Sequence, residues 1–394
     1  MIESLERKST PVSRLDKLDF GSVIRMQQHL YERALQRTDE CRLSTRVIAY
    51  DATTDEGFGC DPAFPVYPAA VGARVHALPL EQQARLTRIL FAMEKQNVAQ
   101  NEMITLTWNT HCAIRAFGLF TEEYWVQHRE TLDEYDHIYG FELLARKLLG
   151  AGLSAAELTR KNRFRDFTFK TLDPILQSPR AVPSLYFTLR FVANVFLKMV
   201  EGFCFDPRRT DLTYSEPLRA INQAHHDDEA RHFTSSWAYG RQLFTSIADP
   251  TERELVRAII TLYLSLHIRA LAIGGHLVRT GLESLLFAVE TGALPALDLS
   301  REEIVAAYAS HCSFVDLGPS RRRESFRWAA SQFRKLESSL GIEPRDYALD
   351  QLRPENQAVL DRIRVAILAN GSGPDDDLPF EPCYQVYQAM LGEA

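Results

Sequence analysis

One pattern of acidic and histidine residues occurs twice in the chain and constrains its fold more than any other feature. Each copy begins with a glutamate and continues, about thirty residues later, with Asp-Glu-x-x-His. The copies comprise Glu102, Asp133, Glu134 and His137, and then Glu201, Asp228, Glu229 and His232. In both copies, the interval between the two glutamates accommodates a helix, a reversal and part of the next helix. We therefore expect each copy to form an antiparallel helical pair on which the two carboxylates meet.

Apolar residues recur with helical periodicity along most of the chain, whereas the alternating patterns typical of strands are nearly absent. Segment 51–75 is rich in glycine and proline and is predicted to be irregular. The interruptions elsewhere are too short to be interdomain linkers. The sequence predicts helices over 22–39, 80–118, 121–149, 153–160, 182–205, 215–247, 250–280, 282–291, 301–315, 320–339 and 354–368.

Helical spacing places the acids and histidines on common faces. At about 100° per residue, His225, Glu229 and His232 lie within an arc of about 60°. Glu134 and His137 likewise share a face at positions i and i+3. Burying an unpaired charge costs several kcal/mol, so such residues on otherwise apolar faces need partners or a metal ion. Two copies predict a four-helix bundle with four carboxylates and two histidines inside, the ligand set of ferritin-like di-iron and di-manganese proteins.

We therefore predict an all-α, ferritin-like four-helix bundle with a dinuclear metal site, enlarged by additional C-terminal helices. One domain is expected over 1–394, with the metal-binding bundle at about 80–247 and accessory helices at 250–368. Glu94 is an alternative ligand to Glu102, but it fits the thirty-residue interval less well. Asp133 and Asp228 directly precede ligand glutamates. Because a metal-bound histidine usually donates its second N–H to a carboxylate, we expect each aspartate to hold the histidine of the opposite copy.

Composition excludes several other classes of protein. The formal charge of −7 disfavours nucleic-acid binding, which needs a basic face. No apolar signal-peptide region is visible near the N-terminus, and the most hydrophobic stretch, 256–278, is interrupted by arginines and histidines and is too polar to span a membrane. The six cysteines show no metal-binding or redox spacing and are interpreted as free thiols. These features predict a cytoplasmic protein.

The repeated pattern resembles the ferritin-like di-iron oxygenase superfamily, over residues 102–232. His225, one turn before Glu229, adds a third histidine, and the resulting set of seven resembles that of the p-aminobenzoate N-oxygenase family. That family includes the arylamine oxygenase of chloramphenicol biosynthesis. The resemblance implies the metal ligands Glu102, Glu134, His137, Glu201, His225, Glu229 and His232. It implies two iron ions as cofactors, with manganese as the less favoured metal, and O2 as co-substrate.

The function implied by this resemblance is oxygenation of an aromatic amine, through hydroxylamine and nitroso stages, toward a nitro group in secondary metabolism such as antibiotic biosynthesis. Hydroxylation of carbon in a natural-product intermediate is the alternative activity. Iron storage without catalysis is an alternative from another class, but the long segment 233–394 follows the last ligand, which favours an enzyme. A radical-generating subunit would need an oxidisable tyrosine beside a ligand, and Tyr135 and Tyr139 lie off the ligand face.

The substrate and the electron donor are less constrained by the sequence. Arg190, Asn194 and Asn109 lie on the ligand-bearing helices and are the candidate substrate residues. Arg190 suits a substrate carboxylate, although a salt bridge to an acid of a neighbouring helix is the alternative. No flavin, nicotinamide or iron–sulfur motif occurs, so an external donor, such as a ferredoxin or a reductase, is expected. The resemblance further implies a homodimer, with no nucleic-acid or membrane partner.

Overall fold

All secondary structure in the described part of the chain is helical, which confirms the all-α prediction. The computed structural model describes residues 19–35, 42–53, 67–149, 178–204, 216–264 apart from 255, 258, 262 and 263, 275–309 and 320–343. Within these ranges, it does not describe the side chains of 33–35, 97, 100, 101, 104, 200–204, 275–280, 309 and 320–326.

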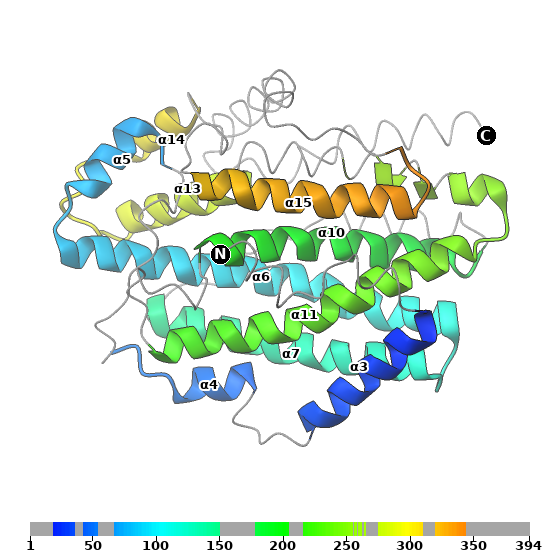
Figure 1. Cartoon of the computed structure of the whole chain (residues 1–394). Helices are drawn as coiled ribbons and strands as arrows, with labels where there is room; N and C mark the ends of the chain where they lie inside the picture. The colour runs from blue at the N-terminus through cyan, green and yellow to red at the C-terminus, as the bar shows by residue number, and fades with distance from the viewer. Residues whose placement is uncertain are drawn as a thin grey trace.

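The named helices follow the chain in one order (Figure 1). They are α3 (Phe20–Leu35), α4 (Leu43–Ala49), α5 (Ala69–His76), α6 (Leu80–Phe117), α7 (Glu122–Leu149), α10 (Ala181–Cys204), α11 (Glu216–Thr245), α13 (Gly275–Glu290), α14 (Arg301–Ala309) and α15 (Ser320–Ser339). The predicted helices 80–118, 121–149, 182–205, 215–247 and 320–339 agree with α6, α7, α10, α11 and α15 to within two residues at each end.

Three predictions of local structure are wrong. Helix α5 lies in a segment predicted to be irregular, where Pro68 precedes the helix and Val71 and Val75 share its buried side. Helix α4 was not predicted, because its seven residues are too few for a periodicity to stand out. The predicted break between 280 and 282 does not occur, since α13 continues through Gly281. Predicted helices 153–160 and 354–368 lie outside the described residues.

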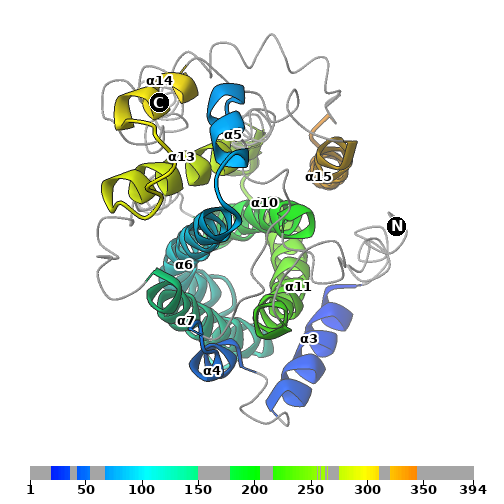
Figure 2. The same cartoon turned by 90° about the vertical axis from the view of Figure 1, so that its left-hand side faces the viewer.

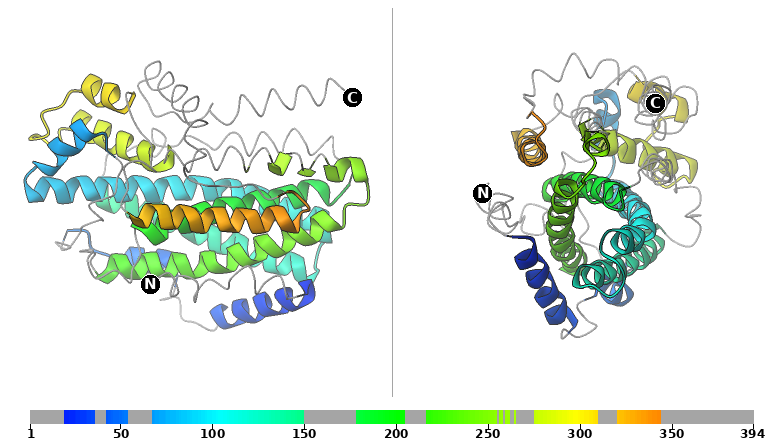
Figure 3. Two further views of the ribbon diagram at one scale, coloured as in Figure 1. Left: turned by 45° about the horizontal axis from the view of Figure 1, so that its top comes forward. Right: turned by 90° about the vertical axis from the view of Figure 1, so that its right-hand side faces the viewer.

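Helices α6, α7, α10 and α11 surround a common interior (Figure 2). Helix α6 packs against α7 and α10, and α11 packs against α10 and α7, so the four helices close a ring. The opposite end view shows the same arrangement, with α3 and α4 outside it (Figure 3). Helix α13 covers α6, and α15 covers α10. No helix in the described part of the chain is both long and apolar enough to cross a membrane.

The short reversal between α6 and α7 sets the level of the first glutamate pair. Gly118, with φ of 82°, follows the last residue of α6, and α7 begins at Glu122. Positive φ is readily adopted by glycine, so the chain turns here without steric cost. Glu102 lies roughly four turns before the end of α6, and Glu134 lies roughly three turns after the start of α7. The two carboxylates therefore reach nearly the same height in the antiparallel pair.

Aromatic side chains fill the contact between α10 and α11. Phe187 stacks against Tyr239 with ring centroids 5.0 Å apart, and Phe191 lies 5.0 Å from Trp237. The two backbones approach closely at Gly240, where an added Cβ would lie 2.7 Å from Thr188 Oγ1 and 3.0 Å from its backbone nitrogen. Only a residue without a side chain permits this spacing.

Helix α4 is held at both of its ends by side chains of α7. The carboxylate of Asp136 accepts hydrogen bonds from the backbone N–H and the hydroxyl of Ser44, in the first turn of α4. Lys147 Nζ donates to the carbonyl oxygens of Ile48 and Tyr50 at the other end. An acid at the N-terminus and a cation at the C-terminus both complement the dipole of the helix, which explains how so short a helix is stabilised.

Candidate metal centre

Two adjoining groups of buried carboxylates and imidazoles lie in the interior between the long helices. The first contains Glu102, His137, His225 and Glu229, and the second contains Glu134, Glu229 and His232. Within each group, the potential ligand atoms lie within 4.8 Å of one another, and every side chain is buried. Glu229 belongs to both groups. Six of the seven predicted ligands are thereby brought together from α6, α7 and α11.

A single carboxylate oxygen of Glu229 faces three histidines. Its Oε1 lies 3.1 Å from His232 Nδ1 and 3.7 Å from both His137 Nδ1 and His225 Nε2. Glu102 Oε1 lies 3.2 Å from His225 Nε2 and 3.7 Å from His137 Nδ1. Glu134 Oε1 completes the second group at 3.1 Å from His232 Nδ1.

The two aspartates of the repeated pattern lie against the histidines crosswise. Asp228 Oδ2 is 3.2 Å from His137 Nε2, and Asp133 Oδ2 is 3.7 Å from His232 Nε2. A carboxylate only accepts hydrogen bonds, so the Nε2 of His137 carries the proton of its bond to Asp228. That assignment leaves the lone pair of Nδ1 facing the acids when the imidazole is neutral, which is the form that binds a metal ion.

Arg231 joins these two aspartates and was given no role by the sequence analysis. Its Nη2 lies 3.2 Å from Asp133 Oδ2 and also donates to Asp228 Oδ1. The guanidinium stacks over the ring of Tyr31 on α3, 5.4 Å from the ring centroid. Its place inside the second Asp-Glu-x-x-His, between Glu229 and His232, was the sequence feature that could have revealed it.

A second buried arginine, Arg190 of α10, pairs with two acids of α7. Its Nη1 donates to Glu130 Oε2 at 2.5 Å, and its Nη2 donates to Glu134 Oε1 at 2.7 Å. This is the salt bridge to a neighbouring helix that the sequence left as the alternative to a substrate clamp. Since both terminal nitrogens are paired with carboxylates of the protein, the structure offers neither to a substrate carboxylate. Glu130, fully buried, was not recognised from the sequence.

The two other candidate substrate residues have different surroundings. Asn109 is fully buried in the network around Arg190, where its Oδ1 accepts from the Tyr186 hydroxyl at 3.2 Å and its Nδ2 lies 3.3 Å from Thr131 Oγ1. This position favours a structural role for Asn109. Asn194 is buried, and its Nδ2 has no hydrogen-bond partner in the described structure.

The remaining predicted residues are placed as follows. The backbone of Glu201 lies in the last turn of α10, but its side chain lies outside the described residues, as do those of His267, His276 and His311. Glu94 is buried but belongs to neither group. His226 is half-buried and outside both groups. Tyr135 and Tyr139 are 59% and 58% exposed and point away from the interior. Cys112 is a buried free thiol.

The donor set passes a test of fit for a metal ion. Three atoms that face the cluster are buried without a hydrogen-bond partner: Glu102 Oε2, Glu134 Oε2 and His137 Nδ1. Leaving buried polar atoms unpaired costs about 1–3 kcal/mol each, and more for charged groups. Carboxylates and imidazoles are ligands that suit iron and manganese. These residues therefore match the requirements of a metal ion bound among them.

Protons take the place of positive metal charge in the cluster described here. Burial alone would lower the pKa of His137 and His232, but the surrounding carboxylates raise both pKa values well above the ordinary range. Burial alone would raise the pKa of Glu134 and Glu229, but His232 and the other histidines nearby hold both pKa values below the ordinary range. Imidazolium–carboxylate pairing thus neutralises part of the buried negative charge.

Two hollows in the structure lie away from the cluster. One, of about 730 Å³, lies between α6, α7 and α13 and is lined by residues that include Arg85, Arg88 and Phe287. The other, of about 370 Å³, is bordered by α11 and α15. Neither is lined by a residue of the two metal-binding groups. Comparison of the chain with known protein families, with curated proteins and with solved structures finds no match.

Proposed function

We propose that this chain is an O2-dependent oxygenase with a dinuclear iron site held in a ferritin-like four-helix bundle. The observation that carries the proposal is the sharing of Glu229 between two adjoining groups of buried ligands. A carboxylate common to two groups suits a pair of metal ions better than a single ion. The repeated Asp-Glu-x-x-His pattern and the ring of four long helices agree with the ligand arrangement of ferritin-like proteins.

The proposed roles of the residues follow from their positions. Glu102, His137, His225 and Glu229 would hold one ion, and Glu134, Glu229 and His232 the other, with Glu201 as a further ligand. Asp228 and Asp133 would keep His137 and His232 in the tautomer that presents Nδ1 to the metal. Arg231 and Arg190 balance the negative charge around the site. Two ferrous ions in this position would supply the electrons with which O2 is reduced.

The proposed reaction is oxygenation of an aromatic amine toward its hydroxylamine, nitroso or nitro product. Its support is the resemblance of the seven residues, and of His225 above all, to the p-aminobenzoate N-oxygenase ligand set. The buried position of His225, 3.2 Å from Glu102, is consistent with that role. Hydroxylation of carbon by the same site is the second candidate reaction.

The decisive experiment is metal analysis combined with oxygen consumption by the reduced protein in the presence of a panel of aryl amines. We expect two iron ions per chain and amine-dependent formation of a nitro, nitroso or hydroxylamine product. The matched control is His226→Ala, which removes a neighbouring histidine outside both groups and should retain metal and product. Protein that is active without metal would overturn the proposal, whereas two bound irons without O2 chemistry would favour a storage function.

A further inference from the structure

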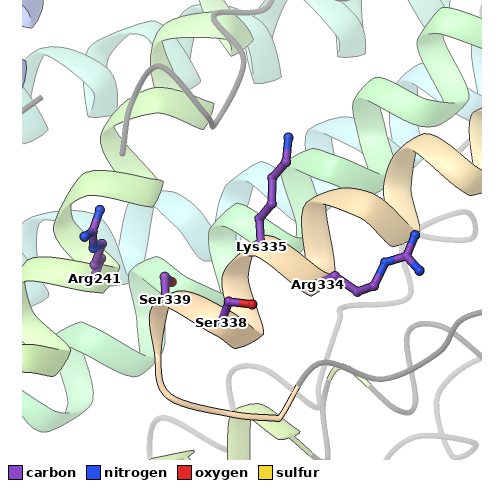
Figure 4. A pocket seen from close by; sticks show the side chains of 5 residues that line it. All are labelled: Arg241, Arg334, Lys335, Ser338 and Ser339. Carbon is purple, nitrogen blue, oxygen red and sulfur yellow. The ribbon is translucent and has the colours of Figure 1, made fainter. Parts of the chain in front are cut away.

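A groove with three cationic side chains lies between α11 and α15 (Figure 4). It is lined by Arg241 of α11 and by four residues of the last turns of α15, Arg334, Lys335, Ser338 and Ser339, and it encloses about 370 Å³. Arg334 and Ser338 are exposed. Among the described residues, no carboxylate is paired with Arg334 or Lys335. The groove therefore presents positive charge together with hydroxyl groups to the outside.

The charge of α15 contrasts with that of the whole chain. Residues 320–339 contain six arginines or lysines and two glutamates, although the chain carries a formal charge of −7. The buried side of α15, which includes Ala330, Phe333 and Leu336, packs against the rest of the protein. Arg327 and Arg334, one heptad apart, are exposed on the same helix. Basic residues concentrated on one helix of an acidic protein form a local patch that attracts negative partners.

Helix α11 connects this groove with the metal-binding groups. Arg241 follows His232 by nine residues, which corresponds to about 13.5 Å along a helix. Trp237 lies one turn before Arg241, and its ring is 5.0 Å from that of Phe191. Phe191 in turn lies 4.8 Å from Phe233, the residue after His232. A chain of aromatic contacts thus extends from beneath the groove to the neighbour of a proposed ligand.

We propose that the groove formed by Arg241, Arg334 and Lys335 docks the acidic face of a one-electron donor protein of the iron–sulfur or flavin class. The proposal rests on the proposed function, because the oxygenase has no redox motif of its own and consumes electrons supplied from outside. Each reduced donor gives up one electron at the groove and leaves oxidised, and two encounters supply an electron pair. The small exposed patch suits this occupant, because transient redox complexes have small, charge-guided interfaces.

A small anion fits the observations less well, since Arg334 is exposed and the groove has no buried cation dedicated to a ligand. A nucleic acid is disfavoured by the overall negative charge of the chain. Electrostatic guidance also makes a specific demand: association should be fast at low ionic strength and should slow steeply as salt is added.

The test uses an acidic [2Fe–2S] ferredoxin as the probe and the full chain, with binding measured before any assay of activity. Arg334→Glu/Lys335→Glu should slow association with metal-free protein by roughly tenfold or more at low salt. Arg334→Gln/Lys335→Gln should have a smaller effect of the same sign. The matched control, Arg74→Glu/Arg146→Glu, makes the same change in net charge at exposed positions on α5 and α7 and should change the rate by less than about threefold.

Equal loss in both charge-reversed proteins would overturn the proposal, because it would show an effect of net charge alone. Binding of RNA or of anionic vesicles at this groove in preference to ferredoxin would overturn it as well. Failure of the proposed function is recognised separately, by the absence of bound iron or by the absence of reduction by dithionite. If dithionite reduces both variants equally but ferredoxin does not distinguish them, the docking site alone is wrong.

Discussion

His137 of the first copy of the repeated pattern is hydrogen-bonded to Asp228 of the second, with Nε2 and Oδ2 3.2 Å apart. Two residues separated by 91 positions thus fix the orientation of one imidazole. The corresponding contact of His232 with Asp133 runs the other way between the copies. Each copy therefore supplies histidine ligands that the other copy orients.

Removing the carboxylate charge at Asp228 should weaken metal binding more than it weakens the fold. We expect Asp228→Asn to lower metal affinity by about 10- to 100-fold, because His137 loses the partner that sets its tautomer. The matched control is Asp227→Asn, since Asp227 is exposed and hydrogen-bonded only to Gln223 in the described structure. Cobalt titration followed by absorption spectroscopy measures both, and equal affinities of the two variants would contradict the prediction.

Glu229 should be the ligand whose loss affects both metal ions. We expect Glu229→Ala to lose both equivalents of iron in elemental analysis, because Glu229 belongs to both groups. His225→Ala should mainly affect one equivalent, since His225 belongs to the first group alone. Glu94→Gln is the control, as Glu94 is a buried carboxylate of α6 outside both groups. Retention of two irons in Glu229→Ala would be incompatible with the proposed site.

Metal binding should release protons, and its affinity should rise with pH. The raised pKa values of His137 and His232 mean that both rings hold protons above their ordinary pKa of about 6.5, and a metal ion must displace these protons. In the metal-free protein, the same imidazolium pairs stabilise the fold fully below that pH and lose their effect as pH rises through the raised values. Calorimetry in buffers of different ionisation enthalpy counts the protons; a heat independent of the buffer would refute this.

Breaking the Arg190 ion pairs should destabilise the metal-free protein strongly. Arg190→Met leaves Glu130 and Glu134 buried without their cation, and we expect a loss of about 3–5 kcal/mol in the free energy of unfolding. Adding Glu130→Gln should recover part of it, because one of the two unpaired charges disappears. Arg146→Met, at an exposed ion pair of α7, should change stability by less than about 1 kcal/mol. Urea unfolding compares the three, and equal stability of Arg190→Met and Arg146→Met would count against a structural role for the pair.

The contact between α10 and α11 should tolerate no side chain at position 240. Gly240→Ala places a methyl group 3.0 Å from the backbone nitrogen of Thr188, so we expect a destabilisation of about 1–3 kcal/mol. Gly72→Ala is the matched control, since its nearest neighbour would be Tyr67 Cβ at 3.6 Å. There, the higher helix propensity of alanine should leave stability unchanged or raise it by up to about 1 kcal/mol. Thermal unfolding of both variants provides the comparison.

The sequence was most informative where one spacing had to satisfy two requirements. Glu134 and His137, or Glu229 and His232, had to fit both a helical face and a partner about thirty residues away, and their meeting could be predicted. Arg190 and Glu130 could not be, because the sequence does not say which of many acids an arginine will contact across helices. Helix α4 was missed for a related reason: its stability comes from Asp136 and Lys147 on another helix, not from its own residues.

The two contacts that hold α4 also limit how α7 can move. Asp136 immediately precedes His137, and Lys147 lies further along the same helix. Turning α7 about its axis far enough to withdraw His137 would also pull Asp136 away from Ser44 and Lys147 away from the carbonyls of Ile48 and Tyr50. Helix α4 thus acts as a rotational stop. Adjustment of the site to different metal charges must then come from side-chain torsions and from the other helices, with α7 as the fixed reference.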